Sequence, residues 1–265
     1  YPFVNTLAKS FSSETYITTG QVFLLPKGFS FASYKNVMFS PSFVYALRNT
    51  VFIAVVGTIL SLLVVLCAAY AFSRKIVGGR PLFVFMLITM FFNGGMIPTF
   101  LQIKSLGLVD NIWALILPSL FSVYNMILAR NFFQDLPDAV IESGMMDGCS
   151  ELSLFYRIVL PMSTPIIATL ALFQLVAFWN TFMQAILYIN DVKLYPLQVY
   201  IRNVVFGAQL SLDKEAMEAV ADYQEQGLEN IKATVLMVST IPIVCVYPFI
   251  QKYFVKGINM GAVKG

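Results

Sequence analysis

The chain has 265 residues, of which 58% are hydrophobic and 12% charged, and its formal net charge is +3. Soluble domains carry roughly 25% charged residues, so this composition indicates an integral membrane protein. The net charge is too small to indicate a nucleic-acid-binding protein. The sequence has no histidine and three cysteines without paired spacing, so no zinc site or disulfide framework is readable, and we expect no metal on this chain.

Five hydrophobic runs have about the length needed to cross the ~30 Å hydrocarbon core of a bilayer. We expect membrane spans at about 49–72, from Pro81 to a break at FFNGGMIP, and at about 112–132, 161–188 and 233–254. The predicted fold is all-α, a polytopic transmembrane helix bundle with a single domain over 1–265. We also expect a sixth span before residue 1 in the complete polypeptide, and a cleaved signal peptide is the alternative.

The distribution of basic residues predicts the orientation of these spans. Basic residues that fall on one side, which we assign to the cytoplasm together with the C-terminus, are Arg74, Lys75, Arg80, Arg130, Arg157, Lys252, Lys256 and Lys264. Segments 1–43 and 190–232 then lie outside, and the acid-rich stretch DKEAMEAVADYQEQGLE in the second is expected to form a surface helix. Residues 134–160 form a cytoplasmic loop.

The cytoplasmic loop contains the polar block AVIESGMMDGCSELSLFYRIVLP at 139–161. Helical spacing is shown first by Pro137, Val140, Ile141, Gly144 and Met145, and again by Leu152, Phe155, Tyr156, Val159 and Leu160, before Pro161 stops the helix. Gly148 can adopt the left-handed conformation that ends a helix, and Ser150 can cap the next one. The pattern predicts two short amphipathic helices, which either lie on lipid headgroups or dock into a protein partner.

The polar block resembles the EAA loop of ABC importer permeases, whose pattern is E-A-A-x-x-D-G-A followed by F-x-x-I-x-L-P. The residues that carry the resemblance are Glu142, Ser143, Gly144, Asp147, Gly148, Phe155, Ile158, Leu160 and Pro161. The two alanines of the pattern are replaced by Ser143 and Gly144, which are also small. AYAFSR, GLVDNIWALILP, FWNTF and the terminal KGINMGAVKG extend the resemblance to maltose-transporter-type permeases of carbohydrate importers along nearly the whole chain.

This resemblance implies a permease subunit in the bacterial cytoplasmic membrane. In such importers the EAA loop docks into a cytoplasmic ATPase, whose closure moves the transmembrane helices. The implied partners are a second permease subunit, two ATPase subunits, an extracytoplasmic solute-binding protein, an oligosaccharide and membrane lipid. Since this chain contains no G-x-x-x-x-G-K-[ST] motif, we expect ATP and Mg to bind the partner ATPase, and we expect no enzyme activity here.

Finer features resemble permeases for larger or acidic oligosaccharides, such as fragments of plant or algal polysaccharides. The stretch FFNGGMIPTFLQIKSLGLVDNIWALILP and the loop KLYPLQVYIRNVV carry this likeness. In maltose-type relatives the corresponding loop contacts the binding protein, and the candidate residues here are Tyr195, Pro196 and Tyr200. A solvated connector is the alternative for the loop, and NGG at 93–95 is expected to be a helix-ending turn.

Polar residues inside the fourth predicted span are candidates for a sugar path. Asn180, Gln184 and Tyr188 are four residues apart and would share one helical face, with Trp179 beside them. Such groups either hold helices together by hydrogen bonds or line a route for sugar. Asn125 on the third span is a weaker candidate.

Two other functional classes fit the sequence less well. A secondary transporter commonly carries ionisable residues within its spans, and these spans contain almost none. A membrane-embedded enzyme needs a nucleophile or a metal set. A permease for another solute delivered by a binding protein remains the principal alternative to oligosaccharide uptake.

Overall fold

The computed structural model describes residues 1–265 except 75, 93, 207–226 and 262–265, and it does not describe the side chains of 243 and 246–261. The described chain is mainly helical and contains no strand, which confirms the predicted all-α class. It forms two compact units. The first comprises Tyr1–Phe52, Leu108–Ala114 and Trp179–Tyr247, and the second comprises Ile53–Gly107, Leu115–Phe178 and Pro248–Gly265.

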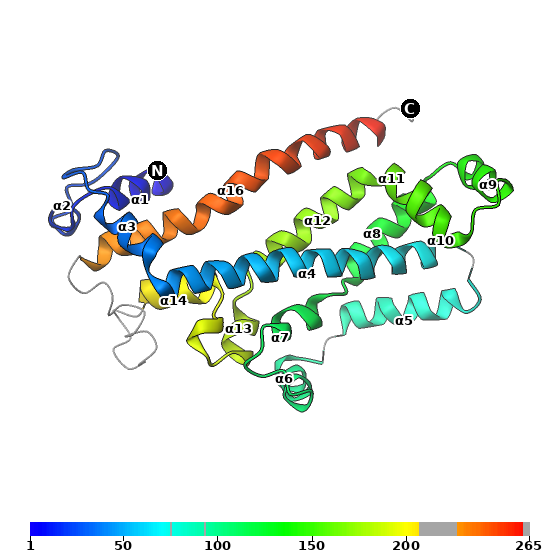
Figure 1. Ribbon diagram of the computed structural model, residues 1–265, viewed down its shortest axis with the longest axis horizontal. Helices are drawn as coiled ribbons and strands as arrows, with labels where there is room; N and C mark the ends of the chain where they lie inside the picture. The colour runs from blue at the N-terminus through cyan, green and yellow to red at the C-terminus, as the bar shows by residue number, and fades with distance from the viewer. Residues whose placement is uncertain (75, 93, 207–226, 262–265) are drawn as a thin grey trace. The chain divides into compact units, whose positions relative to one another are not determined.

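The longest apolar helix is α4, Pro41–Ser73, which runs without a break through 33 residues (Figure 1). It is the one described helix that is long and apolar enough by itself to cross a membrane. Three further spans are possible if each bent pair of helices counts as one crossing. The expected fifth span falls in α16, Leu228–Gly261, where half of the side chains lie outside the described residues, so the number of spans stays a prediction.

The second unit contains most of the apolar helices, and two of their breaks lie at glycine or proline. Its helices are α5 (Gly79–Phe91), α6 (Met96–Ser105), the turn η1 (Leu117–Ser119), α8 (Val123–Gln134) and α12 (Thr164–Trp179), which ends one residue into the first unit. The predicted break at FFNGGMIP is confirmed between α5 and α6, where Gly95 has φ +90°. Asn93 of that turn lies outside the described residues. The predicted third span is bent by 48° where η1 meets α8, since Pro118 interrupts it.

The predicted fourth span, 161–188, is wrong as one continuous helix. α12 ends at Trp179, and α13 (Met183–Tyr188) is a separate helix of the first unit. The predicted stop at Pro161 is one residue early. A helical run that begins at Glu151 continues through Pro161 and ends with α11 (Leu160–Met162). The chain then bends by 82° at Ser163.

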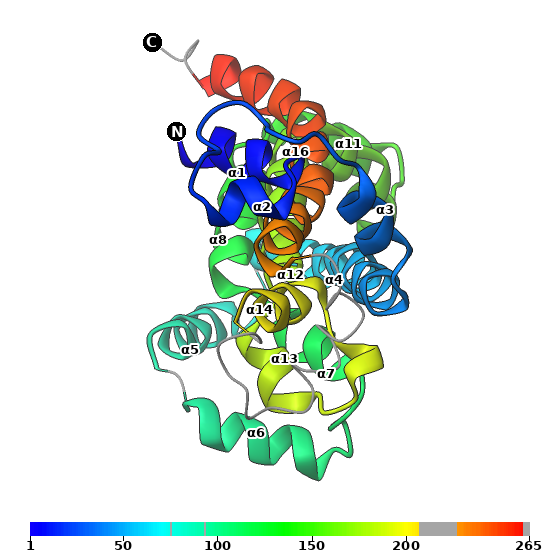
Figure 2. The ribbon, with the colours of Figure 1, turned by 90° about the vertical axis from the view of Figure 1, so that its left-hand side faces the viewer.

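The first unit begins with α1 (Pro2–Ser10), α2 (Glu14–Thr18) and α3 (Ala32–Phe39), so segment 1–43 is mostly helical. The side-chain amide of Asn230, at the start of α16, donates to the carbonyls of Lys9 and Ser12 at 2.9 and 2.6 Å. The carboxylate of Glu14 accepts the backbone N–H groups of Glu229 and Asn230 and so caps α16. Figure 2 shows α1 and α2 beside this first part of α16.

The remaining elements of the first unit follow α13. They are the turn η3 (Val192–Leu194) and α14 (Leu197–Phe206), so the predicted loop 190–232 is partly helical. α7 (Trp113–Ile116) starts in this unit, where Trp113 packs edge-on against Phe52 at 6.2 Å between ring centroids. Most of the expected acid-rich surface helix, 213–229, lies outside the described residues, as do the side chains of the C-terminal lysines.

Candidate coupling site

The polar block forms the predicted helix pair within the second unit. α9 spans Asp138–Met146, and α10 spans Glu151–Leu154. Gly148 lies between them with φ +78°, and the Ser150 hydroxyl accepts the Ser153 N–H at 3.3 Å. Both local predictions, the left-handed glycine and the serine cap, are therefore confirmed.

The chain leaves α10 through a π-helical turn, η2 (Phe155–Val159), which the sequence pattern did not predict. Because a π turn holds more residues than an α turn, it changes which side chains share a face. Phe155 and Val159 are buried as predicted, but Leu152 and Tyr156 are 70% and 55% exposed. Leu154, which the predicted pattern omitted, is buried instead.

The inner side of the loop packs into the core of the second unit. Phe155 and Val159 belong to one buried cluster that also contains Val65, Leu66, Ala69, Met126, Ala129, Phe133 and Leu170, contributed by α4, α8 and α12. The ring of Phe155 lies 4.9 Å from that of Tyr70 on α4. Displacement of the loop must therefore disturb three apolar helices, because close-packed interiors have few voids to absorb it.

Gly144 explains the departure from the family's alanine pattern. It is buried, and a Cβ atom at this position would lie 2.6 Å from Leu154 Cδ2 and 2.7 Å from Ile158 Cδ1. The space that an alanine methyl would occupy is filled by these two side chains. Ser143 is exposed, and its hydroxyl donates to the Val140 carbonyl at 2.9 Å.

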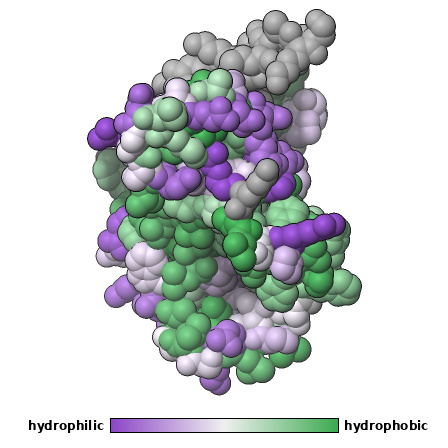
Figure 3. All heavy atoms as spheres, turned by 90° about the vertical axis from the view of Figure 1, so that its right-hand side faces the viewer, coloured by the Kyte–Doolittle hydropathy of each residue, from purple (hydrophilic) through white to green (hydrophobic). Residues whose placement is uncertain are grey.

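The outer side of the loop carries apolar and acidic groups together. Met146 is 88% exposed, and Met145 is exposed as well, so the predicted single apolar face of α9 is divided between core and surface. Glu142 and Asp147 are exposed, so their carboxylates are available to basic groups of a partner. Glu151 is less available to a partner, because its carboxylate already accepts a hydrogen bond from the Tyr70 hydroxyl at 2.6 Å. Figure 3 faces the end of this unit that carries α9 and α10, and it shows hydrophilic side chains above a broad hydrophobic area.

The predicted path residues do not share one helical face. Asn180 lies in the break after α12, where its side-chain oxygen accepts from Gln198 Nε2 at 3.0 Å. Gln184 is exposed on α13, whereas Trp179 and Tyr188 are 7% and 3% exposed and belong to the core of the first unit. Asn125 is buried in the second unit, on α8. The chain break near Asn180 is the reason for the difference, since spacing by four has this meaning only in a continuous helix.

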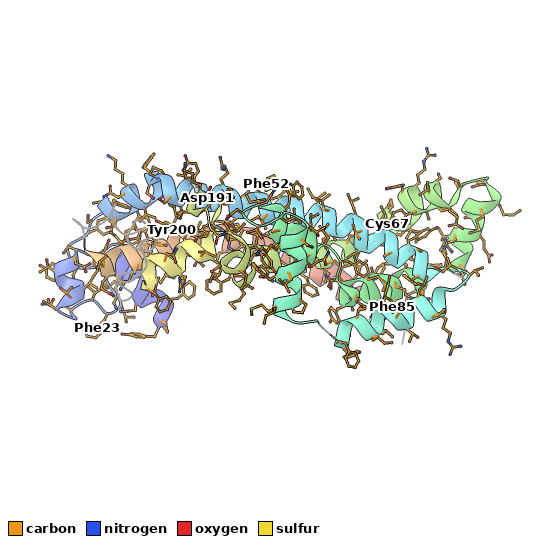
Figure 4. The ribbon with its side chains drawn as sticks, turned by 90° about the horizontal axis from the view of Figure 1, so that it is seen from below. Phe23, Phe52, Cys67, Phe85, Asp191 and Tyr200 are labelled. Atoms are coloured by element: carbon orange, nitrogen blue, oxygen red, sulfur yellow. The ribbon has the colours of Figure 1, made fainter. Side chains whose placement is uncertain are left out.

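The residues predicted to meet a binding protein are also buried. Tyr195 and Tyr200 are 8% and 4% exposed, and Pro196 is buried. Tyr200, on α14 (Figure 4), packs against the ring of Phe43 at 5.8 Å. These side chains pack at the base of the loop, and their contact with a binding protein stays a prediction.

Two buried residues of α4 fix the same segment by hydrogen bonds. Asn49 Nδ2 donates to the carbonyls of Lys193 and Tyr195 at 2.7 and 3.2 Å. The Thr50 hydroxyl accepts the Leu197 N–H at 2.7 Å. Sequence reasoning missed both residues, because polar residues early in a hydrophobic run look like a boundary of the span.

Asp110 is the other residue that sequence reasoning missed. Its carboxylate accepts the backbone N–H and side-chain amide of Asn190 and the N–H of Asp191, and its own N–H donates to the Tyr188 carbonyl at 2.8 Å. The hydrogen bonds from Asn190, followed by that from Asp191, lower the pKa of the Asp110 carboxyl. Asp110 has φ +58°, a conformation that aspartate tolerates better than most residues. The D-N pair within GLVDNIWALILP was the available signal.

Comparison with known proteins agrees with this arrangement. The sequence profile of the binding-protein-dependent transport system inner membrane components matches residues 37–260. Two proteins of Bacillus subtilis (strain 168) are similar over 100% of this chain. The polygalacturonan/rhamnogalacturonan transport system permease protein YtcP is 43% identical, with 92% of its length covered, and protein LplC is 44% identical, with 89% covered.

A solved structure is similar over 96% of this chain and 90% of its own, with a TM-score of 0.88 and 32% sequence identity. It is a crystal structure of a bacterial ABC transporter involved in the import of the acidic polysaccharide alginate. Members of the matching family work in the bacterial cytoplasmic membrane with a second permease, a solute-binding protein and an ATPase. The chain belongs to the binding-protein-dependent transport system inner membrane components, the permease subunits of ABC importers.

Proposed function

We propose that this permease forms half of the translocation path of an ATP-driven importer for acidic oligosaccharides. The similarity to YtcP over the whole chain carries the substrate class, because that relative is named for polygalacturonan and rhamnogalacturonan transport. The structural relative involved in alginate import points to the same chemistry, a polymer of acidic sugars. Neutral arabino-oligosaccharides are the second candidate, since relatives named for them are 26% identical.

The helix pair α9–α10 is the proposed contact with the ATPase. Its outer side offers Met146 and Leu152, 88% and 70% exposed, as apolar anchors for a groove on the partner. Glu142 and Asp147 add two exposed carboxylates that can pair with arginine or lysine. ATP and Mg would bind the two ATPase subunits, and this chain would transmit their closure through Phe155 and Val159 to the core helices.

The alternative of a hairpin resting on lipid fits the loop less well. A surface-lying helix buries one apolar face in the bilayer, whereas α9 and α10 direct one apolar side into their own protein core and a second side outward. In the proposed orientation, the loop and the C-terminus lie in the cytoplasm. Cysteine labelling of Met146→Cys from the inside and the outside of sealed vesicles tests this directly.

The substrate assignment is tested in liposomes containing the complete importer. Oligogalacturonate, presented by the cognate binding protein, should stimulate ATP hydrolysis and enter the vesicles, whereas arabino-oligosaccharides of equal length should do neither. Stimulation by the neutral sugar alone would contradict the acidic substrate class. ATP hydrolysis without stimulation by any sugar would contradict the wider proposal of oligosaccharide uptake.

Within the path, Gln184 is the residue that we propose to contact sugar, with Asn180 beside the same break. Replacement of Gln184 by leucine keeps most of its volume and removes the amide, so transport should fall while the complex stays assembled. Tyr188→Phe is the matched test of the packing role, because Tyr188 is buried. A loss of assembly with Gln184→Leu, at unchanged transport per complex, would assign the residue to helix packing.

A further inference from the structure

A pocket of about 330 Å³ lies in the second unit, outside the coupling site. It is formed where α4 ends, α5 begins and α8 approaches its end, and its lining includes Phe72, Arg74, Arg80, Phe83 and Arg130. Three arginines line it, and no acidic residue of the described chain does. Since like charges repel when they gather, such a site favours an anionic occupant.

Two of the three arginines, Arg74 and Arg130, are held by neighbours that leave donors available. Arg130 Nε donates to the Phe72 carbonyl at 2.9 Å, and its guanidinium lies 4.7 Å from the centre of the Phe83 ring. Arg74 donates through Nη2 to the Tyr70 hydroxyl at 3.2 Å. Each guanidinium has five N–H donors, so these contacts use only part of its capacity.

Arg74 carries the second observation that points to a ligand. Its Nε atom is buried and has no hydrogen-bond partner within the part of the chain that the structure describes. A buried donor without an acceptor is unfavourable, and an arginine edge fits two oxygens of a phosphate group. An oxygen-rich anion in the pocket would supply the missing acceptor.

The surroundings of the pocket identify the source of the phosphate. α5 starts at the pocket, and none of its 13 residues is buried. Its exposed apolar side chains include Leu82, Phe85 and Ile88, at 52%, 63% and 50%. Figure 4 shows Phe85 on α5 and Cys67 on α4, two of the exposed residues of these helices. A phosphate held by the arginines would therefore have an uncovered apolar helix beside it for acyl chains.

We propose that this pocket binds the phosphate of an anionic phospholipid, with the acyl chains along α5. Basic pockets between transmembrane helices are a recognised type of lipid headgroup site. The pocket lies at the end of α4 that also contacts the coupling loop, because Tyr70 bonds both Arg74 and Glu151. The proposal requires that the complex retains phosphatidylglycerol in preference to phosphatidylcholine.

Native mass spectrometry of the complete importer, with equal amounts of the two lipids, measures this preference. Arg74→Gln and Arg80→Gln should each weaken retention of phosphatidylglycerol about fivefold, the effect of one positive charge near an anionic lipid surface. Arg48→Gln is the matched control, since Arg48 lies on the same helix α4, stacks on Tyr45 at 5.4 Å and does not line the pocket. Arg48→Gln should leave retention unchanged, and an equal loss in all three variants would overturn the proposal.

The source of the anion is tested by competition. Soluble dihexanoyl phosphatidylglycerol should displace the bound lipid, whereas inorganic phosphate at the same concentration should not. Displacement by both would show a free-anion site and would overturn the lipid assignment. Cross-linking of Arg80→Cys to the second permease subunit, without any retained phosphatidylglycerol, would show a subunit contact instead and would also overturn it.

Discussion

The coupling loop at 134–160 and the segment 179–206 are both polar interruptions between apolar helices, but they are stabilised in different ways. The shape of the coupling loop depends on local devices, a left-handed glycine and a serine cap, although Phe155 and Val159 also anchor it in the core. The segment 179–206 depends on side chains far away in the sequence, such as Asn49 and Asp110. Local devices leave a readable pattern in the sequence, whereas a long-range hydrogen bond leaves none.

The largest effect should come from removing a long-range support. Asn49→Leu keeps the side-chain volume but leaves the carbonyls of Lys193 and Tyr195 without their donor, which should cost about 2 to 4 kcal/mol. Hydrogen exchange of the Leu197 amide, which Thr50 holds beside them, reports this loss. Asn36→Leu on α3, which is partly exposed, is the control and should change little. Unchanged protection of Leu197 would show that the segment is held by something else.

The next effect tests the local device. Gly148→Val places a β-branched residue at φ +78° and should cost about 1 to 3 kcal/mol through backbone strain alone, because no atom lies within 4 Å of its Cβ position. Substrate-stimulated ATP hydrolysis should be lost while membrane insertion stays normal. Gly148→Asn, which tolerates this conformation better, should recover part of the activity.

Gly20→Val is the matched control for that experiment. Gly20 has φ +68° and equally open surroundings, but it lies in the first unit. Both valine variants should lose similar stability, and only Gly148→Val should lose coupling. Equal loss of stimulated ATP hydrolysis in the two variants would attribute the effect to general destabilisation.

A smaller effect is expected from acid. Because the folded-state pKa of Asp110 is lowered, its stabilising contribution is present above its ordinary pKa of about 4 and is lost as the pH falls through the folded-state value. Protection of the Asn190 and Asp191 amides should therefore decrease below about pH 4. Asp110→Asn should remove this pH dependence, and Asp135→Asn, exposed at the end of α8, should keep it. If Asp110→Asn shows the same pH dependence of amide protection as the wild type, the Asp110 carboxylate is not the cause of that dependence.

The smallest effect is expected at Gly144, where helix propensity and packing change stability in opposite directions. Gly144→Ala restores the family pattern and adds up to ~1 kcal/mol of helix propensity, but its methyl group must displace the ends of Leu154 and Ile158. The net change in thermal stability should stay within about 1 kcal/mol, with coupling retained. The larger side chain in Gly144→Leu does not fit even if Leu154 and Ile158 shift, so this variant should impair stimulated ATP hydrolysis. If Gly144→Ala strongly lowers thermal stability, the side chains of Leu154 and Ile158 cannot move to make room for the methyl group.

These comparisons explain how much of the structure the sequence could predict. Helical class, the break at NGG, the left-handed Gly148 and the Ser150 cap were all readable, because each depends on residues within a few positions. The face containing Leu152 and Tyr156 was wrong, since an unpredicted π turn changes the spacing that periodicity assumes. Which residues couple to the ATPase, contact sugar or meet a binding protein stays a prediction.

The proposed path was the least predictable part, for a related reason. Periodicity assumed one helix from 161 to 188, and the break after Trp179 removed the common face of Asn180 and Gln184. Neither glycine nor proline marks that break in FWNTF. At the break, the Asn180 side chain accepts a hydrogen bond from Gln198, a contact that only the folded chain brings together.

The Tyr70 hydroxyl is shared between two groups, as it donates to Glu151 on α10 and accepts from Arg74 in the arginine pocket. Thermodynamic linkage requires that any coupling free energy between two sites acts equally in both directions. The coupling energy carried by this bridge sets one factor. A lipid in the pocket changes the affinity of the coupling loop for the ATPase by that factor, and the bound ATPase changes the affinity of the pocket for the lipid by the same factor. Lipid composition would then act as an effector of the importer, in the same sense that a small molecule does in a soluble enzyme.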